Sequence, residues 1–279
     1  MTPEVLVIGH LVKDLVGDGW RLGGGAHYAA TQFSRLGMRV GVVTAYGEEI
    51  EHPALPRVEW NVVRSLETTT FENVYSEGKR AQRVAGRAGT IGYDDIPPEW
   101  RDAPIILFAP VLDEIDEALP SQIAARETLV ALGAQGWLRR LDDGQVRPID
   151  FDVEPAWLAG QLVFVSEEDV EDADAVSGWQ QKVRMVVLTR GRRGYTIWNA
   201  DGAFSPPTQL VAEIDPTGAG DVFAAAFTYK YALGGDPLAA GRFAHAAASL
   251  AVQGEGIDGI GTRAEIEAQV QREAAVGAG

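Results

Sequence analysis

Residues 215–221, Asp215-Pro216-Thr217-Gly218-Ala219-Gly220-Asp221, decide the fold that we predict for this chain. The β-like run Gln209–Ile214 precedes them, and the apolar run Val222–Leu233, ended by two glycines, predicts a helix after them. A glycine-rich turn at the start of a helix directs several backbone N–H groups toward one point, and the helix dipole adds partial positive charge there. The stretch therefore predicts an anion-binding site.

Asp221 is unexpected at such a site, because a carboxylate repels a bound phosphate. Its position is explained if Asp221 is a general base, which takes a proton from an attacking hydroxyl while the N–H groups hold the phosphoryl group in transfer. The alternative is structural: Thr217 or Asp221 caps the helix and carries no chemistry.

Composition and charge exclude several classes of protein. The 279 residues suit one large α/β domain or two small ones, and the formal net charge of −16 argues against binding to nucleic acid or to an anionic membrane. The lack of cysteine excludes disulfides, thiolate metal sites and cysteine nucleophiles. No apolar run approaches the roughly 18 residues of a membrane span. The first residues carry no basic segment and predict a strand rather than a signal peptide, so we expect a cytoplasmic enzyme.

Short apolar runs separated by segments of helix length predict a doubly wound, parallel sheet. The expected strands are Val5–Ile8, Val40–Thr44, Ile105–Phe108, Thr128–Leu132, Leu162–Val165 and Met185–Thr189. Between the first two, Ala26–Leu36 predicts a helix that ends at Gly37. Ligands of such sheets bind beyond the carboxyl ends of the strands, and the candidate motifs of this chain all follow strand ends.

Two motifs in the first third of the chain each allow a functional and a purely structural interpretation. The glycines of residues 22–25 open a helix, either as a flexible turn or as a place where a ligand approaches the backbone closely. Residues 68–75 and 79–84 alternate like the strands of a hairpin. We interpret that hairpin as a lid over the substrate, and the alternative is a solvated edge hairpin.

Two further motifs follow expected strands of the second half. Ser166-Glu167-Glu168-Asp169 has the pattern of a helix-capping box, which is its alternative interpretation. Residues 189–194, Thr-Arg-Gly-Arg-Arg-Gly, form a glycine turn that is otherwise a plain loop or hairpin.

The string Asp-Pro-Thr-Gly-Ala-Gly-Asp-Val-Phe at residues 215–223 resembles the C-terminal signature of the ribokinase/PfkB family of carbohydrate and nucleoside kinases. The resemblance extends to the first strand, the glycine helix, the hairpin, the acid after a strand and the glycine turn. It implies a ribokinase-like three-layer α/β sandwich with a mostly parallel central sheet and a small β-hairpin lid. Residues 1–279 would then form a single kinase domain, with the lid built from about residues 12–22 and 66–90.

The resemblance also implies roles for individual residues. Asp221 would be the catalytic base, with Gly218, Ala219 and Gly220 stabilising the transferring group. Asp14 and Gly24 fall where the family binds substrate hydroxyls; Tyr28, where the family often has asparagine, points to a polyol other than ribose, and we expect Arg83 of the hairpin to reach substrate or phosphate. The nucleotide-binding residues would be Thr189, Gly191, Gly194, Thr217 and Gly254, with Asp169 near the metal.

The implied reaction is transfer of the ATP γ-phosphoryl group, with Mg²⁺, to a hydroxyl of a small sugar or polyol. The lid, Tyr28, Lys79-Arg80-Ala81-Gln82 and residues 134–136 are similar to the myo-inositol kinase-like branch. The alternatives are a nucleoside kinase and a catalytically silent sugar-binding or regulatory protein. A monovalent cation and a homodimer paired through the lid stay open. A P-loop kinase is excluded, because its Gly-x-x-x-x-Gly-Lys-Ser/Thr loop is missing, and no Gly-x-Gly-x-x-Gly motif of a Rossmann dehydrogenase follows the first strand.

Overall fold

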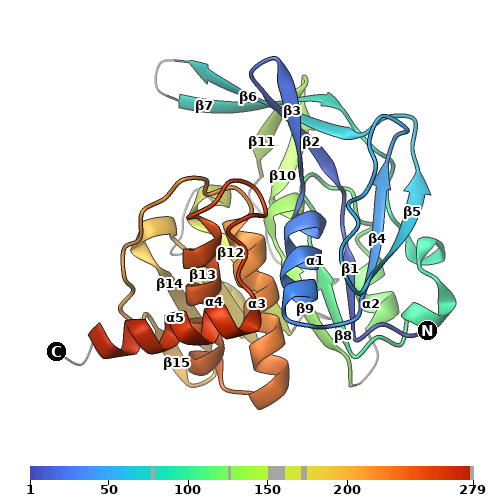
Figure 1. Cartoon of the computed structure of the whole chain (residues 1–279). Coiled ribbons are helices and arrows are strands. Elements are labelled where there is room, and N and C mark those ends of the chain that lie inside the picture. The colour runs from blue at the N-terminus through green and yellow to red at the C-terminus, as the bar shows by residue number, and fades with distance from the viewer. Residues whose placement is uncertain (77–78, 125–126, 150–160, 171–174, 277–279) are drawn as a thin grey trace.

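A computed structural model describes residues 1–76, 79–124, 127–149, 161–170 and 175–276. Within them, a nine-stranded sheet forms the body of the protein (Figure 1). In spatial order its strands are β15 (Gly202–Phe204), β14 (Tyr195–Asn199), β13 (Met185–Thr189), β12 (Leu162–Ser166), β9 (Leu129–Gly133), β8 (Ile105–Phe108), β1 (Val5–Ile8), β4 (Val40–Tyr46) and β5 (Val58–Arg64). The seven strands from β13 to β5 pair in parallel, and β14 and β15 add antiparallel strands at one edge.

Both faces of this sheet are covered, because its central strands are apolar on both sides. In β1, Val5 and Val7 pack into one core cluster, whereas Leu6 and Ile8 pack into the other. The first cluster lies under α1 (Gly25–Arg35), α3 (Ala219–Gly234), α4 (Pro237–Ala251) and α5 (Arg263–Val276). The second lies under α2 (Leu119–Ile123) and the 3₁₀ turns Tyr93–Asp95, Pro98–Trp100, Gln135–Leu138 and Ala175–Gln181. Further 3₁₀ turns span Glu167–Asp169 and Gly191–Arg193.

Local signals fix the ends of the long helices. Asp236 caps α4 by accepting hydrogen bonds from the N–H groups of Leu238 and Ala239, at 2.9 and 3.2 Å. Gly235 ends α3 in the left-handed conformation, with φ of 67°. None of the helices in the described residues is long and apolar enough to cross a membrane.

A second, six-stranded sheet lies across the carboxyl ends of the parallel strands, at the top of Figure 1. Its strands are β10 (Arg139–Asp142), β11 (Gln145–Pro148), β7 (Lys79–Gly86), β6 (Thr69–Ser76), β2 (Val12–Val16) and β3 (Gly19–Gly23), in that order. Only β2 and β6 pair in parallel within it. Its inner face packs on the loop after β8, where Val12 and Phe71 contact Val111 and Leu112.

The junction between the two sheets at β1 and β2 is buried and hydrogen-bonded. His10 is 1% exposed, and its two ring nitrogens lie 2.9 Å from the Thr69 hydroxyl and 2.9 Å from the Gly89 carbonyl oxygen. The Leu11 N–H donates to the Thr44 hydroxyl at 2.8 Å. The connection from β1 to β2, which joins the two sheets, is therefore short and held by buried hydrogen bonds.

Two local expectations differ from the structure. Gln209–Ile214 is not a strand: β14 and β15 already form that edge of the sheet, and Leu210 and Ile214 are 73% and 64% exposed. The second sheet also extends beyond residues 12–22 and 66–90, because β10 and β11 complete it. Their turn contains Asp143 and Gly144, both with positive φ, as a two-residue type I′ hairpin requires.

Candidate active site

The glycine turn at residues 215–221 stands at the start of α3, as its sequence predicts. Gly218 is the N-cap, with φ of 75°, and α3 begins at Ala219. A methyl group added at Gly218 would lie 2.2 Å from Cγ of Tyr28, so the Tyr28 ring supports the turn directly. The Ala219 N–H donates to the Pro216 carbonyl oxygen at 3.2 Å. The turn itself thus uses the Ala219 amide, and Gly218 and Gly220 carry the amides that we assign to an anion.

The carboxylate of Asp221 lies against the start of α1. A methyl group added at Gly25 would be 2.8 Å from Oδ1 of Asp221 and 2.8 Å from the Ala109 carbonyl oxygen at the end of β8. Burial, and secondly the negative charge of Asp169, raise the pKa of Asp221 to about 7, while the charge of Arg139 acts in the opposite direction. A carboxyl group with this pKa can accept a proton near neutral pH.

Asp169 is paired with an arginine of the second sheet. Its side chain is 3% exposed, and its Oδ1 accepts hydrogen bonds from Arg139 at 2.8 Å and from Gln135 at 3.4 Å. Arg139 begins β10 and also donates to Gln82 of β7 at 3.4 Å. The preceding Ser166 accepts a hydrogen bond from the Glu168 N–H, but the segment is a 3₁₀ turn and not the start of an α-helix.

Asp215 ties three segments together. Its Oδ1 accepts the Thr217 N–H at 3.0 Å, and its Oδ2 accepts the Gly256 N–H at 3.1 Å and Nη1 of Arg21 at 3.1 Å. Burial alone would raise the pKa of Asp215, but the hydrogen bonds from Thr217 and Gly256 and the charge of Arg21 lower it below its usual value. Asp215 is therefore an ionised support for the turn.

Tyr28 stands among these charges. Its side chain is buried, and burial, followed by the negative charges of Asp14, Asp215 and Asp221, raises its pKa, while Arg21 acts in the opposite direction. Asp14 of β2 lies against β3, because a methyl group added at Gly23 would be 2.0 Å from its Oδ2. Gly24, with φ of 99°, packs against the His10 carbonyl oxygen. The charges of Asp14 and of two aspartates of the glycine turn thus act on the same buried tyrosine.

The nucleotide-binding candidates surround the segments that lead to and from the turn. Thr189 ends β13, and Gly191 and Gly194 have φ of 50° and 82° in the turn that follows. A methyl group added at Gly194 would meet the Thr208 side chain at 2.7 Å. The Ile214 N–H donates to the Val252 carbonyl oxygen at 2.7 Å, which brings the end of α4, with Gly254, beside the start of α3. Thr217 is exposed.

The structure does not place Arg83 beside the glycine turn and Tyr28. Its side chain is exposed, and it alternates along β7 with Val84, which packs toward the inner core of the second sheet. Gln82, on the inner face, reaches Arg139 instead. Arg21 and Arg139 were not assigned from the sequence. The Asp143-Gly144 hairpin signal could have placed Arg139 on a strand of the second sheet.

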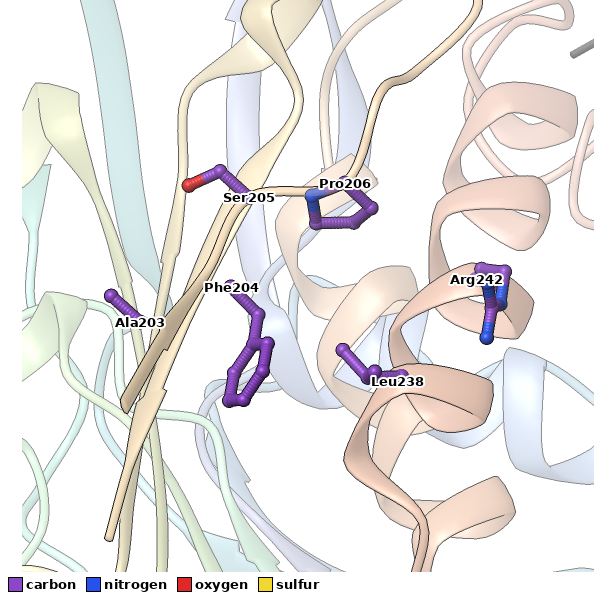
Figure 2. Close-up of a pocket in the computed structure, with 6 residues that line it drawn as sticks. All are labelled: Ala203, Phe204, Ser205, Pro206, Leu238 and Arg242. Atoms are coloured by element: carbon purple, nitrogen blue, oxygen red, sulfur yellow. The ribbon is translucent and has the colours of Figure 1, made fainter. Parts of the chain in front are cut away.

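A hollow of about 330 Å³ lies apart from this site, between β15 and the first half of α4 (Figure 2). In Figure 2, Phe204 and Leu238 approach each other across it and Arg242 stands on α4. The catalytic turn meets the other end of α4, near Gly256, so this hollow is not part of the site.

Replacing Arg139 with methionine should lower the free energy of unfolding by about 3 kcal/mol, because it leaves the buried Asp169 carboxylate without its guanidinium partner. Urea denaturation at pH 7.5 measures the loss. Adding Asp169→Asn to the variant should recover most of the stability. The control, Arg263→Met, removes the exposed pair with Glu267 and should change stability little. An equal loss in both single variants would contradict a buried pair.

Three comparisons with known proteins bear on this site. Residues 154–260 match the model of the pfkB family of carbohydrate kinases. The chain is 29% identical to a cytidine kinase of Thermococcus kodakarensis, over 83% of this chain and 89% of the relative. It is 26% identical to an inositol 3-kinase of Arabidopsis thaliana, over 79% of this chain and 65% of the relative.

A solved structure with the same fold is a pyrophosphate-dependent kinase of the ribokinase family, complexed with a pyrophosphate analogue and myo-inositol. The TM-score is 0.78 at 20% identity, over 95% of this chain and 99% of that one. The ribokinase-like fold predicted from the sequence is confirmed. Residues 154–260, the part of the chain that matches the pfkB family, contain the glycine turn at the start of α3 and the carboxyl group of Asp221.

Proposed function

We propose that the protein transfers the γ-phosphoryl group of ATP to a hydroxyl of a small sugar or polyol, with Asp221 as the general base. The observation that carries the proposal is the position of Asp221. A carboxyl group with a pKa of about 7 stands in the first turn of α3, beside the amides of the glycine turn and opposite the start of α1.

In this proposal the residues divide the work as phosphoryl transfer requires. Asp221 takes the proton of the acceptor hydroxyl as its oxygen forms the new bond to phosphorus. The bond to the leaving diphosphate breaks, and a phosphate ester and ADP result. The amides of Gly218 and Gly220 stabilise the charge of the group in transfer. Tyr28 holds the turn in place, and Asp14 orients other hydroxyls of the acceptor.

The elements around the turn fit a nucleotide. Thr189, Gly191, Gly194, Thr217 and Gly254 would line it, and the hydrogen bonds of Asp215 and Val252 hold two of these segments beside the start of α3. The described residues contain no group of three His, Cys, Asp or Glu that could cage a metal ion. We propose that Asp169, which pairs with Arg139 in this structure, would bind Mg²⁺ through water, and that phosphates and water would supply the other ligands. When bound, Mg²⁺ neutralises charge on the phosphates.

For the acceptor we propose a cyclic polyol such as myo-inositol. Two observations support it: the likeness to an inositol 3-kinase, and a buried Tyr28 close enough to Asp14 for the Asp14 charge to raise its pKa. A nucleoside is the second candidate, because the identity to a cytidine kinase extends over more of both proteins.

A screen of purified protein tests the function. Mg·ATP and Mg·pyrophosphate serve as donors, with polyols including myo-inositol, hexoses, pentoses and nucleosides including cytidine as acceptors. Phosphorylated products are identified by mass spectrometry, and Asp221→Asn is the background control. We expect a phosphorylated polyol or sugar from ATP. Cytidine as the best acceptor would establish the second candidate, and no product above the control with any pair would refute a kinase.

The rate should depend on pH through Asp221. The base must be deprotonated to act, so with a pKa of about 7 we expect kcat/KM to be constant above pH 8 and to fall about tenfold per pH unit well below pH 7. Initial rates between pH 5.5 and 9, at saturating Mg²⁺, measure this limb. A flat profile down to pH 5.5 would show that no group with this pKa acts as the base.

Two features predicted from the sequence remain proposals. A homodimer would form through the β6–β7 hairpin, and sedimentation velocity would detect it. Activation by a monovalent cation is the other, and potassium titration of the rate measures it.

A further inference from the structure

The β2–β3 hairpin carries Asp14, a candidate for binding the acceptor, and Arg21, which contacts the glycine turn through Asp215. Asp14 and Arg21 are directly paired across these two strands. Cross-strand partners lie on the same face of a sheet, and Val12, on the same face as Asp14, packs into the core beneath the sheet. Both side chains therefore project from the inner face of one hairpin, Asp14 beside Gly23 and Arg21 toward Asp215.

Arg21 reaches the turn through Asp215. Its Nη1 lies 3.1 Å from Oδ2 of Asp215, whose own side chain is 9% exposed. The same carboxylate holds the Thr217 N–H, one residue before Gly218, and the Gly256 N–H after α4. A displacement of Asp215 thus moves both the turn that we assign to the phosphoryl group and the segment that we assign to the nucleotide.

We propose that Arg21 is a positioning residue that couples acceptor binding on the β2–β3 hairpin to nucleotide binding at the turn. The inference rests on the proposed function. An acceptor that contacts Asp14 fixes the hairpin, and the hairpin fixes Asp215 through Arg21. By linkage, a bound nucleotide that orders the turn must favour the acceptor by the same factor. Arg21 acts through Asp215 and needs no contact with the reacting atoms.

Arg21→Met and Arg21→Lys, with Lys13→Met as the control, test the proposal. Lys13 is the neighbour of Asp14 on β2 and lies on the opposite face, so the control removes the same charge from the same hairpin. The first measurement is hydrogen exchange of the peptide of residues 213–222 in the ligand-free protein. We expect faster exchange in Arg21→Met, a smaller change in Arg21→Lys, and wild-type exchange in Lys13→Met.

The second measurement is the Kd of Mg·AMP-PNP with and without saturating myo-inositol, or cytidine if that is the acceptor that the wild type phosphorylates. The acceptor should tighten the wild-type Kd by about fivefold or more, at the low end of measured couplings, and Arg21→Met should bring this ratio close to one. Arg21→Lys should retain part of it.

The two possible failures are distinguishable. A wild type that phosphorylates no acceptor above the Asp221→Asn control in the screen refutes the proposed function before any Arg21 variant is made. Wild-type exchange in Arg21→Met overturns the coupling whatever the function is. So does an undiminished ratio in Arg21→Met, or an equal loss of the ratio in Lys13→Met, since the effect would then come from charge alone.

Discussion

Replacing Asp221 with asparagine should cut turnover by at least about 100-fold, the low end for the loss of a general base. The amide keeps the shape of the side chain beside Gly25 but cannot accept the proton of the acceptor hydroxyl. We therefore expect the Kd of Mg·AMP-PNP to stay close to that of the wild type. Steady-state kinetics and equilibrium binding measure the two quantities separately, and turnover near that of the wild type would dismiss the base.

The same variant has a second readout, which does not depend on the substrate. The pKa of Asp221 in the folded protein, about 7, exceeds its ordinary value of 3.8. Between these values the folded state keeps a proton on Asp221 that the unfolded state has lost, so the contribution of Asp221 to stability rises as the pH falls from 7 toward 4. Asparagine removes this dependence. Asp221→Asn should therefore be more stable than the wild type at pH 8, and the difference should vanish near pH 4; equal stability at pH 8 would indicate an unperturbed, solvated carboxylate.

Replacing Gly218 with alanine should lower kcat by about 100- to 1,000-fold, the range measured when a donor to the developing charge is lost. The added methyl group would lie 2.2 Å from Tyr28 Cγ and 2.4 Å from both Cδ atoms, so the turn or the buried ring must move. Either movement displaces the amides of the turn from the group in transfer, and kinetics with the best acceptor measures the result.

Gly235 supplies the matched control, because it ends the same helix in the same left-handed conformation. Its φ is 67°, compared with 75° for Gly218, and an added methyl group would find no atom within 4 Å. Both alanine variants carry the strain of that conformation, about 1–2 kcal/mol, but only Gly218→Ala meets the ring. An equal loss of kcat in both variants would mean that backbone strain, and not the position of the turn, causes the effect.

The parallel strands could be predicted because each is a short run of residues that are apolar on both faces of the sheet. Val5–Ile8, Ile105–Phe108 and Met185–Thr189 have the predicted bounds. Gln209–Ile214 is also mainly apolar, apart from Gln209 and Glu213, but it forms no strand, because β14 and β15 already occupy that edge of the sheet. Composition alone cannot tell which edge of a sheet is still open.

The glycine turn could be placed at the start of a helix from the sequence because its glycines, its aspartate and the following helix are contiguous. Arg21 and Arg139 could not, since each acts on a carboxylate far along the chain: Arg21 on Asp215 and Arg139 on Asp169. Such pairs depend on the placement of the second sheet, which local periodicity does not encode. Arg83 was assigned from the sequence, but its place in a cationic run did not show which face of β7 its side chain occupies. The structure places that side chain on the exposed face.

The buried junction at His10 and Leu11 limits how the second sheet can move over the candidate site. Asp14 is only a few residues beyond the His10 ring and the Leu11 N–H, which are hydrogen-bonded to three other segments. A swing of the whole upper sheet about this junction would break those buried hydrogen bonds, each costly to lose without water to replace it. We therefore expect the acceptor to enter when the β2–β3 and β6–β7 hairpins bend, on the nanosecond-to-microsecond scale of loop motion. The Asp14 carboxylate would already be in place when it does.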